Sequence, residues 1–222
     1  MTTVGIIGSG MIGGTVARLS VAAGYHVVVS NSRGPETLAE LAAELGPLAT
    51  AGTAGQAAEA GDLVLVSVPV KAFGELPVKP LDGKPVMDTG NYYPQRDGHI
   101  NELDTGALTS SGLLQRELPG AQVVKVFNNI YFRHLASLAR PHGAPDRSAL
   151  PIAGDSAAAK AAVTAFLDSI GYDAVNAGSL AGSWHQEPGT PVYGTPYGPY
   201  SDEAGTVAPA ARIHADLVGA HR

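Results

Sequence analysis

The residues best suited to chemistry lie near the start of the chain. Positions 8 to 13 form a G-x-G-x-x-G pattern between a short apolar run and a segment that favours a helix: Gly8, Ser9, Gly10, Met11, Ile12 and Gly13. In this pattern the first glycine makes a tight turn, the second lets the backbone approach a pyrophosphate, and the third lets the helix pack on the strand. Backbone N–H groups and the positive end of the helix dipole then attract the anion. The pattern predicts a dinucleotide site, with a glycine-rich turn that binds no ligand as the alternative.

The residues after the second expected strand indicate which dinucleotide binds. Sites for NAD usually place Asp or Glu there to bind the ribose 2′-hydroxyl, whereas this chain has Asn31, Ser32 and Arg33. Arg33 offers a guanidinium fork that matches a phosphate, and its two neighbours offer neutral donors. Hydrogen bonds to a charged group contribute about 1.5–3 kcal/mol each, so these residues favour the 2′-phosphate of NADP. A solvated surface arginine is the alternative.

Two further strand ends are expected to line the cofactor groove. Ligands of open parallel sheets bind beyond the carboxyl ends of the strands. The residues at these two ends are Ser67, Val68 and Pro69 after the fourth expected strand, and Thr89, Gly90 and Asn91 after the fifth. We therefore expect contacts between these residues and the cofactor, the alternative being ordinary turns that close the strands.

Residues after the sixth expected strand could act on a second substrate. Asn128 can bond a carboxamide or a substrate oxygen, or it can serve a turn. Tyr131 and His134 are three residues apart, so a helix would place them on one face as proton donors, and Tyr92 and Tyr93 are further candidates. Hydride transfer depends on the placement of the two reactants more than on acid–base groups. Aromatic packing is the alternative role of these rings.

Residues 184–200 are rich in Gly, Pro and Tyr, which predicts a long loop. Tyr193, Tyr197 and Tyr200 could stack on a flat heterocycle as a lid, or they could cover a neighbouring subunit. The histidines show no metal-ligand spacing and the chain has no cysteine, so we expect no metal site.

Strands that alternate with helices must hold these residues. Short apolar runs predict strands, and apolar residues at i, i+3, i+4 and i+7 predict helices. The expected strands are 4–7, 26–30, 48–50, 63–68, 84–88, 123–127, 150–154 and 172–175, and the expected helices are 11–23, 35–45, 56–60, 156–170 and 208–218. Such βαβ units predict a Rossmann-type, doubly wound α/β fold with a mostly parallel sheet. We expect an NADP-binding domain over residues 1–148 and a small C-terminal α/β cap for the substrate over 149–222.

The composition argues against several classes of protein. The 222 residues carry a net charge of −6 without a basic cluster, which argues against nucleic-acid binding. Hydrophobic residues make up 45% of the chain, so disorder is not expected. No apolar stretch approaches the roughly 20 residues that span a bilayer, and the N-terminus lacks the features of a signal peptide. We expect a cytoplasmic protein that does not enter a membrane.

These residues resemble the family of NADP oxidoreductases that depend on the deazaflavin coenzyme F420. The resemblance rests on the glycine turn and on segments 31–33, 67–69, 123–130, 153–155 and 176–180, and it runs over roughly residues 1–182. Residues 88–98 look like the bacterial subgroup. Asn128 stands where archaeal members carry a histidine, and a Gly/Pro/Tyr loop stands where those members have an apolar helix. The resemblance implies an NADP-binding Rossmann domain, direct hydride exchange between NADP(H) and coenzyme F420, and a homodimer.

The sequence therefore predicts an NADP-dependent oxidoreductase, with hydride transfer between NADP(H) and coenzyme F420 as the leading hypothesis. One alternative is an NADPH-dependent reductase of a small carbonyl, imine or flavin. Another is a non-catalytic NADP-sensing module. Tyr131 has no lysine four residues later, which argues against ordinary carbonyl reduction.

Overall fold

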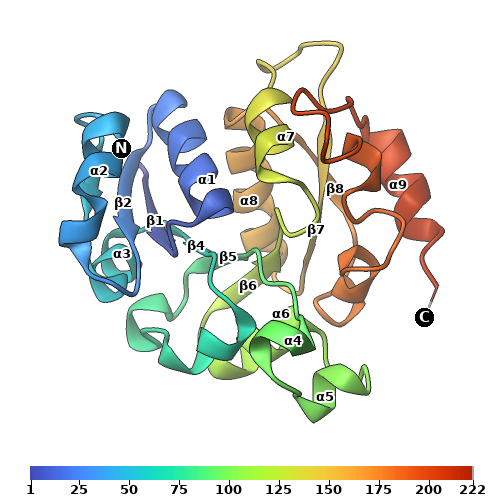
Figure 1. Ribbon diagram of the computed structural model, residues 1–222, viewed down its shortest axis with the longest axis horizontal. Coiled ribbons are helices and arrows are strands. Elements are labelled where there is room, and N and C mark those ends of the chain that lie inside the picture. Colours follow the sequence, from blue (N-terminus) through green and yellow to red (C-terminus); the bar gives the residue numbers. More distant parts are fainter. Residues whose placement is uncertain (222) are drawn as a thin grey trace.

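The computed structural model describes residues 1–221, which build an eight-stranded sheet with helices on both faces (Figure 1). The strands lie in the order β3-β2-β1-β4-β5-β6-β7-β8. Their bounds are β1 Thr3–Ile7, β2 His26–Ser30, β3 Ala49–Ala51, β4 Leu63–Val66, β5 Pro85–Asp88, β6 Gln122–Lys125, β7 Ala149–Gly154 and β8 Asp173–Asn176. Strand β7 runs antiparallel to β6, and the other neighbouring pairs are parallel. The order of the first six strands is that of a Rossmann fold, as predicted.

Nine α-helices lie among the described residues, and several begin at a polar cap. Their bounds are α1 Met11–Ala22, α2 Ala39–Leu45, α3 Ala54–Ala60, α4 Pro94–Asp97, α5 Asn101–Asp104, α6 Ser110–Glu117, α7 Phe132–Ser137, α8 Ala157–Ser169 and α9 Ala210–Val218. Five 3₁₀ helices among the described residues cover Pro35–Leu38, Val70–Glu75, Lys79–Leu81, Ala181–Gln186 and Thr195–Tyr197. Thr53 and Gln56 form a reciprocal capping box at the start of α3.

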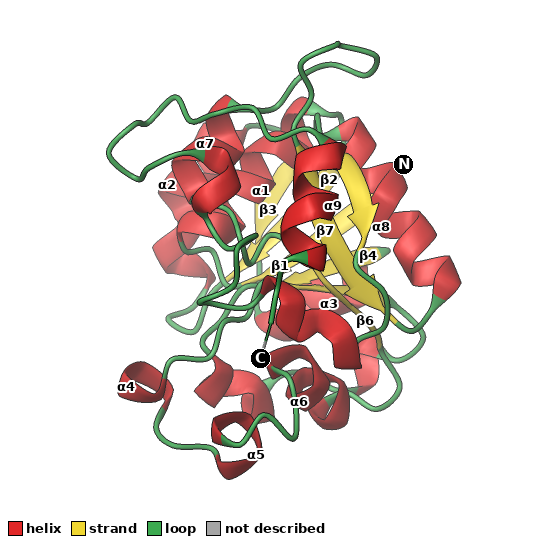
Figure 2. Ribbon diagram, turned by 90° about the vertical axis from the view of Figure 1, so that its right-hand side faces the viewer, coloured by secondary structure: helices red, strands yellow, loops and turns green. Residues whose placement is uncertain are grey.

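Alternate residues of the central strands pack into two separate cores. Leu63 and Leu65 of β4 belong to the core beneath α1, α2 and α8, whereas Val64 and Val66 belong to the core beneath α3 and α6. Figure 2 shows helices on both sides of the sheet. Because both faces of these strands are covered, the strands must be apolar throughout. This requirement explains why only 15% of the residues are charged.

The sixth strand is shorter than predicted. The sequence predicts a strand over 123–127, but β6 ends at Lys125 because the chain turns sharply two residues later. Phe127 has a φ angle of 64°, in the left-handed region that residues other than glycine seldom adopt. The turn carries Asn128 and Asn129 across the ends of the strands. Helices α4, α5, α6 and α7 were not predicted.

The C-terminal part of the chain continues the sheet of the N-terminal part. β7 pairs with β6, and β8 pairs with β7. The boundary between a cofactor domain and a cap at residues 148 and 149 stays a prediction. Among the helices of residues 1–221, none is both long enough and apolar enough to cross a membrane.

Candidate functional site

The glycine-rich turn connects the end of β1 to the start of α1. Gly8 has a φ angle of 100°, and a methyl group added to it would lie 2.2 Å from the carbonyl oxygen of Ser67. A methyl group on Gly13 would lie 1.9 Å from the carbonyl oxygen of Gly8. In contrast, a methyl group on Gly10 would meet no atom within 4 Å, and no side chain caps α1 at this position. The turn therefore leaves open space and backbone N–H groups at the helix start, which fits a pyrophosphate.

A cavity of about 130 Å³ lies on one side of this turn, at the ends of β1, β2 and β4. We call it the β2 cavity. Its lining residues are Ile7, Gly8, Asn31, Ser32, Ala54, Val68, Ala72, Glu75 and Leu76. Most of these walls are apolar, as a flat purine base requires.

The loop after β2 is held in place by its own hydrogen bonds. Asn31 Nδ2 donates to Thr37 Oγ1 at 2.9 Å, and Asn31 Oδ1 accepts from the Arg33 backbone N–H at 2.9 Å. Ser32 and Arg33 are exposed beside the β2 cavity, and within residues 1–221 the Arg33 guanidinium has no ion pair. The guanidinium is therefore available to an anion at this end of the groove.

A second cavity, of about 220 Å³, lies on the other side of the turn. We call it the aromatic cavity. Its lining residues are Met11, Ile12, Thr89, Asn91, Phe127, Asn128, Asn129, Ile130, Tyr131, Phe132, Tyr193 and Tyr200. They come from the start of α1, the ends of β5 and β6, and a distant loop. The glycine turn thus lies between two cavities along the carboxyl ends of the strands, where a dinucleotide lies in Rossmann folds.

Asn128 lines the aromatic cavity, but its side chain already has protein partners. Its Nδ2 donates to Asn91 Oδ1 at 3.0 Å and to the Gln186 carbonyl at 2.6 Å, and its Oδ1 accepts from Gln186 Nε2 at 3.0 Å. These bonds join the ends of β5 and β6 to the C-terminal part. Of its two predicted roles, this placement favours the turn role.

Tyr131 and His134 lie side by side but face different surroundings. Tyr131 lines the aromatic cavity, and its ring meets the His134 ring edge-on at 5.3 Å between centroids. His134 is fully buried, and its Nε2 lies 2.6 Å from the Asp202 carbonyl oxygen. His134 is absent from the cavity lining. It therefore packs inside the protein and does not face the cavity, which is where the sequence placed it as a proton donor.

A buried charge cluster beneath the aromatic cavity was not predicted. The Lys125 side chain is 0% exposed, and its Nζ donates to the Gly90 carbonyl, Ser110 Oγ and Ser111 Oγ at 2.7–3.1 Å. The carboxylates of Asp88 and Glu187 lie 4.0 and 3.9 Å from Nζ. The sequence does contain a sign of this cluster: Lys125 lies within the apolar run of β6, and a buried charge needs charged or polar partners.

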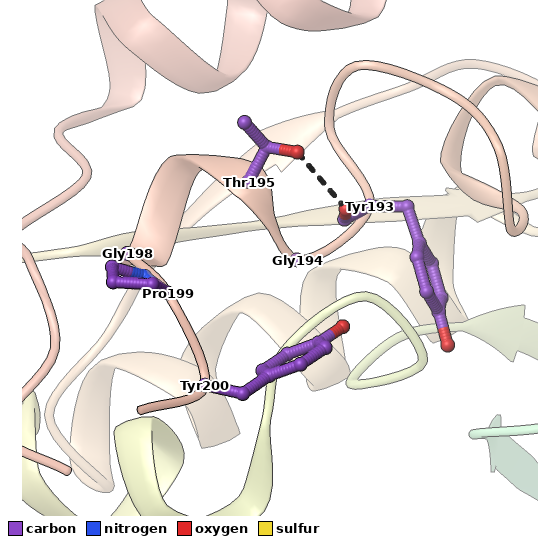
Figure 3. Close-up of a pocket in the computed structure, with 6 residues that line it drawn as sticks. All are labelled: Tyr193, Gly194, Thr195, Gly198, Pro199 and Tyr200. Atoms are coloured by element: carbon purple, nitrogen blue, oxygen red, sulfur yellow. Dashed lines mark hydrogen bonds between the residues drawn. The ribbon is translucent and has the colours of Figure 1, made fainter. Parts of the chain in front are cut away.

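The loop that follows Glu187 of this cluster supplies two of the rings that line the aromatic cavity. We call residues 187–205 the aromatic loop. Figure 3 shows Tyr193 and Tyr200 projecting from this loop, with the phenol end of Tyr200 pointing toward Tyr193. Tyr197 is fully buried, and its hydroxyl donates to the Ala149 carbonyl at 2.8 Å. The sequence left two roles open for these tyrosines: a lid over a flat ring, or a contact with a neighbouring subunit. In the structure Tyr193 and Tyr200 line a cavity of their own chain, whereas Tyr197 anchors the loop.

Most of the residues predicted to bind the cofactor lie along this groove, but Ser67 and Pro69 line neither of its cavities. The glycine turn separates the two cavities, Val68 lines the β2 cavity, and Asn91 lines the aromatic cavity. The carbonyl of Gly90 accepts from Lys125, which fixes the end of β5. Within residues 1–221, no three His, Asp or Glu side chains are grouped to hold a metal ion.

Comparison with known proteins identifies a family for the N-terminal part of the chain. Residues 3–92 match the family model described as NADP oxidoreductase, coenzyme F420-dependent. Protein YjhV of Escherichia coli (strain K12) is 42% identical over 53 residues, which are 24% of this chain and 39% of that protein. The family match includes the glycine turn, residues 31–33 and the ends of β4 and β5.

Two solved structures are similar over most of the chain. The hypothetical protein SMa0349 from Sinorhizobium meliloti is 31% identical, with a TM-score of 0.75 over 86% of this chain and 93% of that one. A candidate F420-dependent NADP-reductase from Arthrobacter sp. FB24 is 24% identical, with a TM-score of 0.65 over 81% of this chain and 86% of that one. The second likeness concerns the fold.

Proposed function

Because the chain belongs to the family of coenzyme F420-dependent NADP oxidoreductases and is an NADP-linked oxidoreductase, we propose that it transfers a hydride directly between NADP(H) and coenzyme F420. The observation that supports this proposal is the aromatic cavity beside the glycine turn. This cavity has tyrosine and phenylalanine walls and lies next to the expected pyrophosphate site. Such walls suit two flat rings that must meet face to face.

The groove suggests how the cofactor would be held. The N–H groups at the start of α1 would bind the pyrophosphate, with Gly10 leaving the space for it. Arg33 and Ser32 would bind the 2′-phosphate, and the β2 cavity would take the adenine. The nicotinamide would then reach the aromatic cavity, where Thr89 and Asn91 are among the polar residues of the wall.

The chemistry of the reaction belongs to the two bound rings, since the nicotinamide gives or takes the hydride. The residues of this chain would place the rings about 3–3.5 Å apart, which can account for most of the lowering of the barrier. The Tyr131, Tyr193 and Tyr200 rings would keep water from the reacting faces. Reduction of the deazaflavin also takes up one proton, which solvent would supply, since Tyr200 in the cavity wall is exposed.

The proposal is tested by mixing the enzyme at catalytic concentration with NADPH and oxidised coenzyme F420. We expect the visible absorbance band of the oxidised deazaflavin to disappear over many turnovers, and to return when reduced coenzyme and NADP⁺ are supplied instead. Gly10→Ala serves as the inactive control, because its methyl group would fill the space at the helix start. Binding of NADPH without turnover of the deazaflavin would overturn the proposal in favour of a carbonyl, imine or flavin substrate.

A further inference from the structure

A hydrogen bond between two tyrosines joins the aromatic loop to the end of β5. The hydroxyls of Tyr93 and Tyr193 lie 2.5 Å apart although the residues are 100 positions apart in the chain. Asn91 Nδ2 also lies 3.4 Å from the Tyr193 hydroxyl. Tyr193 lines the aromatic cavity, whereas Tyr93 is absent from its lining. The bond therefore connects a wall of the cavity to a residue behind that wall.

The backbone on both sides of Tyr193 is fixed by a single residue. Asn129 Nδ2 donates to the Val192 carbonyl at 3.0 Å, and the Gly194 N–H donates to the Asn129 carbonyl at 2.8 Å. These bonds fix where the side chain leaves the loop but not the angle of its ring. That angle depends on the hydroxyl, whose shorter hydrogen bond is the one to Tyr93.

Tyr93 is a rigid partner. Its backbone N–H donates to Asp97 Oδ2 at 3.0 Å, and the Arg96 guanidinium lies 5.1 Å from the centre of its ring. Arg96 Nη2 also donates to the Asn91 carbonyl at 2.6 Å. Burial, followed by the bond to Tyr93, raises the pKa of Tyr193, so the Tyr193 hydroxyl stays protonated at neutral pH.

We propose that Tyr93 is a positioning residue for the second substrate: its hydroxyl holds the Tyr193 ring as a fixed wall of the aromatic cavity. This inference rests on the proposed function. Tyr93 acts through Tyr193 and touches neither reacting ring. A Tyr193 ring that is held in place favours a rigid, planar acceptor. If the Tyr193 ring could rotate, a flat acceptor ring would lose contact with it.

Removal of either hydroxyl tests this role while keeping both rings. A typical neutral hydrogen bond contributes about 1 kcal/mol, so Tyr93→Phe and Tyr193→Phe should each raise the KM for the deazaflavin about fivefold. We expect kcat and the dissociation constant of NADPH to stay unchanged. The double variant should match Tyr193→Phe, because the change at Tyr193 already removes the bond to Tyr93. Effects that multiply in the double variant would overturn the proposal.

Tyr92→Phe is the matched control. The Tyr92 hydroxyl donates to Asp104 Oδ1 at 2.7 Å and accepts from the Ile100 N–H at 2.9 Å, in the α4–α5 segment away from the cavity. This variant should lose at least as much stability and keep the wild-type KM. An equal rise of KM in Tyr92→Phe would show a general effect of lost stability and would overturn the proposal.

Hydrogen exchange tests the bond without any acceptor. In Tyr93→Phe the amides of residues 192–195, 197 and 198 should exchange about fivefold faster, because the lost bond lowers the free energy of opening the loop by about 1 kcal/mol. The same amides should keep their wild-type rates in Tyr92→Phe. If the wild type fails to reduce the deazaflavin, the proposed function falls while hydrogen exchange still decides the role of Tyr93. Unchanged exchange in Tyr93→Phe would overturn the inference alone.

Discussion

Arg33 is the side chain on which the choice between NADP and NAD should depend. It is exposed beside the β2 cavity, and within residues 1–221 it has no carboxylate partner that would compete with a phosphate. A hydrogen bond to a charged group contributes about 1.5–3 kcal/mol, so Arg33→Ala should raise the KM for NADPH at least about tenfold. The KM for NADH should change little. Steady-state kinetics with both cofactors measure the difference.

Arg212→Ala is a suitable control for this prediction. Arg212 is also an exposed arginine, but it lies on α9 and pairs with Asp216 at 2.6 Å. Neither KM should change in this variant. If Arg33→Ala weakens NADPH and NADH equally, Arg33 is not the residue that selects the 2′-phosphate.

The positions of single residues were predictable where local sequence determines them. The glycines and Arg33 belong to short patterns whose neighbours along the chain are also their neighbours in space. Lys125 and Asn128 differ, because their partners include Glu187 and Gln186, about 60 residues away. A pattern along the chain shows that Lys125 is a charge in an apolar strand, but it does not show which carboxylate will compensate it.

The turn between β1 and α1 predicts opposite effects for two similar glycine substitutions. Gly13→Ala would push a methyl group against the Gly8 carbonyl, and such overpacking costs about 1–3 kcal/mol of folding free energy. Gly10 has a φ angle of −72°, which alanine also adopts, and its methyl group would meet open space. Gly10→Ala should therefore fold normally but bind NADPH at least about tenfold more weakly.

Two measurements separate these effects. Urea unfolding gives the free energy of unfolding of each variant without cofactor, and a fluorescence titration gives the dissociation constant of NADPH. Tight NADPH binding by Gly10→Ala would mean that the pyrophosphate does not approach this turn. A Gly13→Ala variant as stable as the wild type would mean that α1 can shift away from β1 at low cost.

The elements themselves were predicted unevenly, for a physical reason. The strands β1, β2, β4 and β5 are short apolar runs bounded by turn residues, so the sequence marks them clearly. Between residues 94 and 137 the helices have only four to eight residues, too few for an apolar period to repeat. The end of β6 depends on the left-handed turn at Phe127, which no local rule predicts for phenylalanine.

At the scale of the whole molecule, the site is made by segments that are distant in the sequence. The glycine turn lies in the first 13 residues, and the facing tyrosines lie at positions 193 and 200. The antiparallel pairing of β7 with β6 brings the C-terminal part beside the ends of the parallel strands. A homodimer and the role of residues 149–222 as a substrate cap stay predictions, because a single chain does not test them.

Acid stability follows from the carboxylates that the fold holds charged. Four carboxylates with a lowered pKa lie at the surface, where an ion pair contributes little to the free energy of unfolding. They are Glu44, Glu102, Asp104 and Asp168. The Asp97 side chain is 0% exposed. Burial alone would raise the pKa of Asp97, but hydrogen bonds from Arg96 and from the backbone of Tyr93 outweigh it, so the pKa is lowered.

A lowered folded pKa means that Asp97 stabilises the protein fully above its unfolded pKa of about 3.9. This contribution is lost as the pH falls through that value and then through the lower folded value. We expect the wild type to be more stable than Asp97→Asn by a constant amount above about pH 5, and by a shrinking amount below about pH 4. Urea unfolding of both proteins across this range measures the difference, with Glu40→Gln on exposed α2 as the control. A gap that stays constant down to the lowest pH would mean that the charge of Asp97 does not stabilise the turn that carries Tyr93.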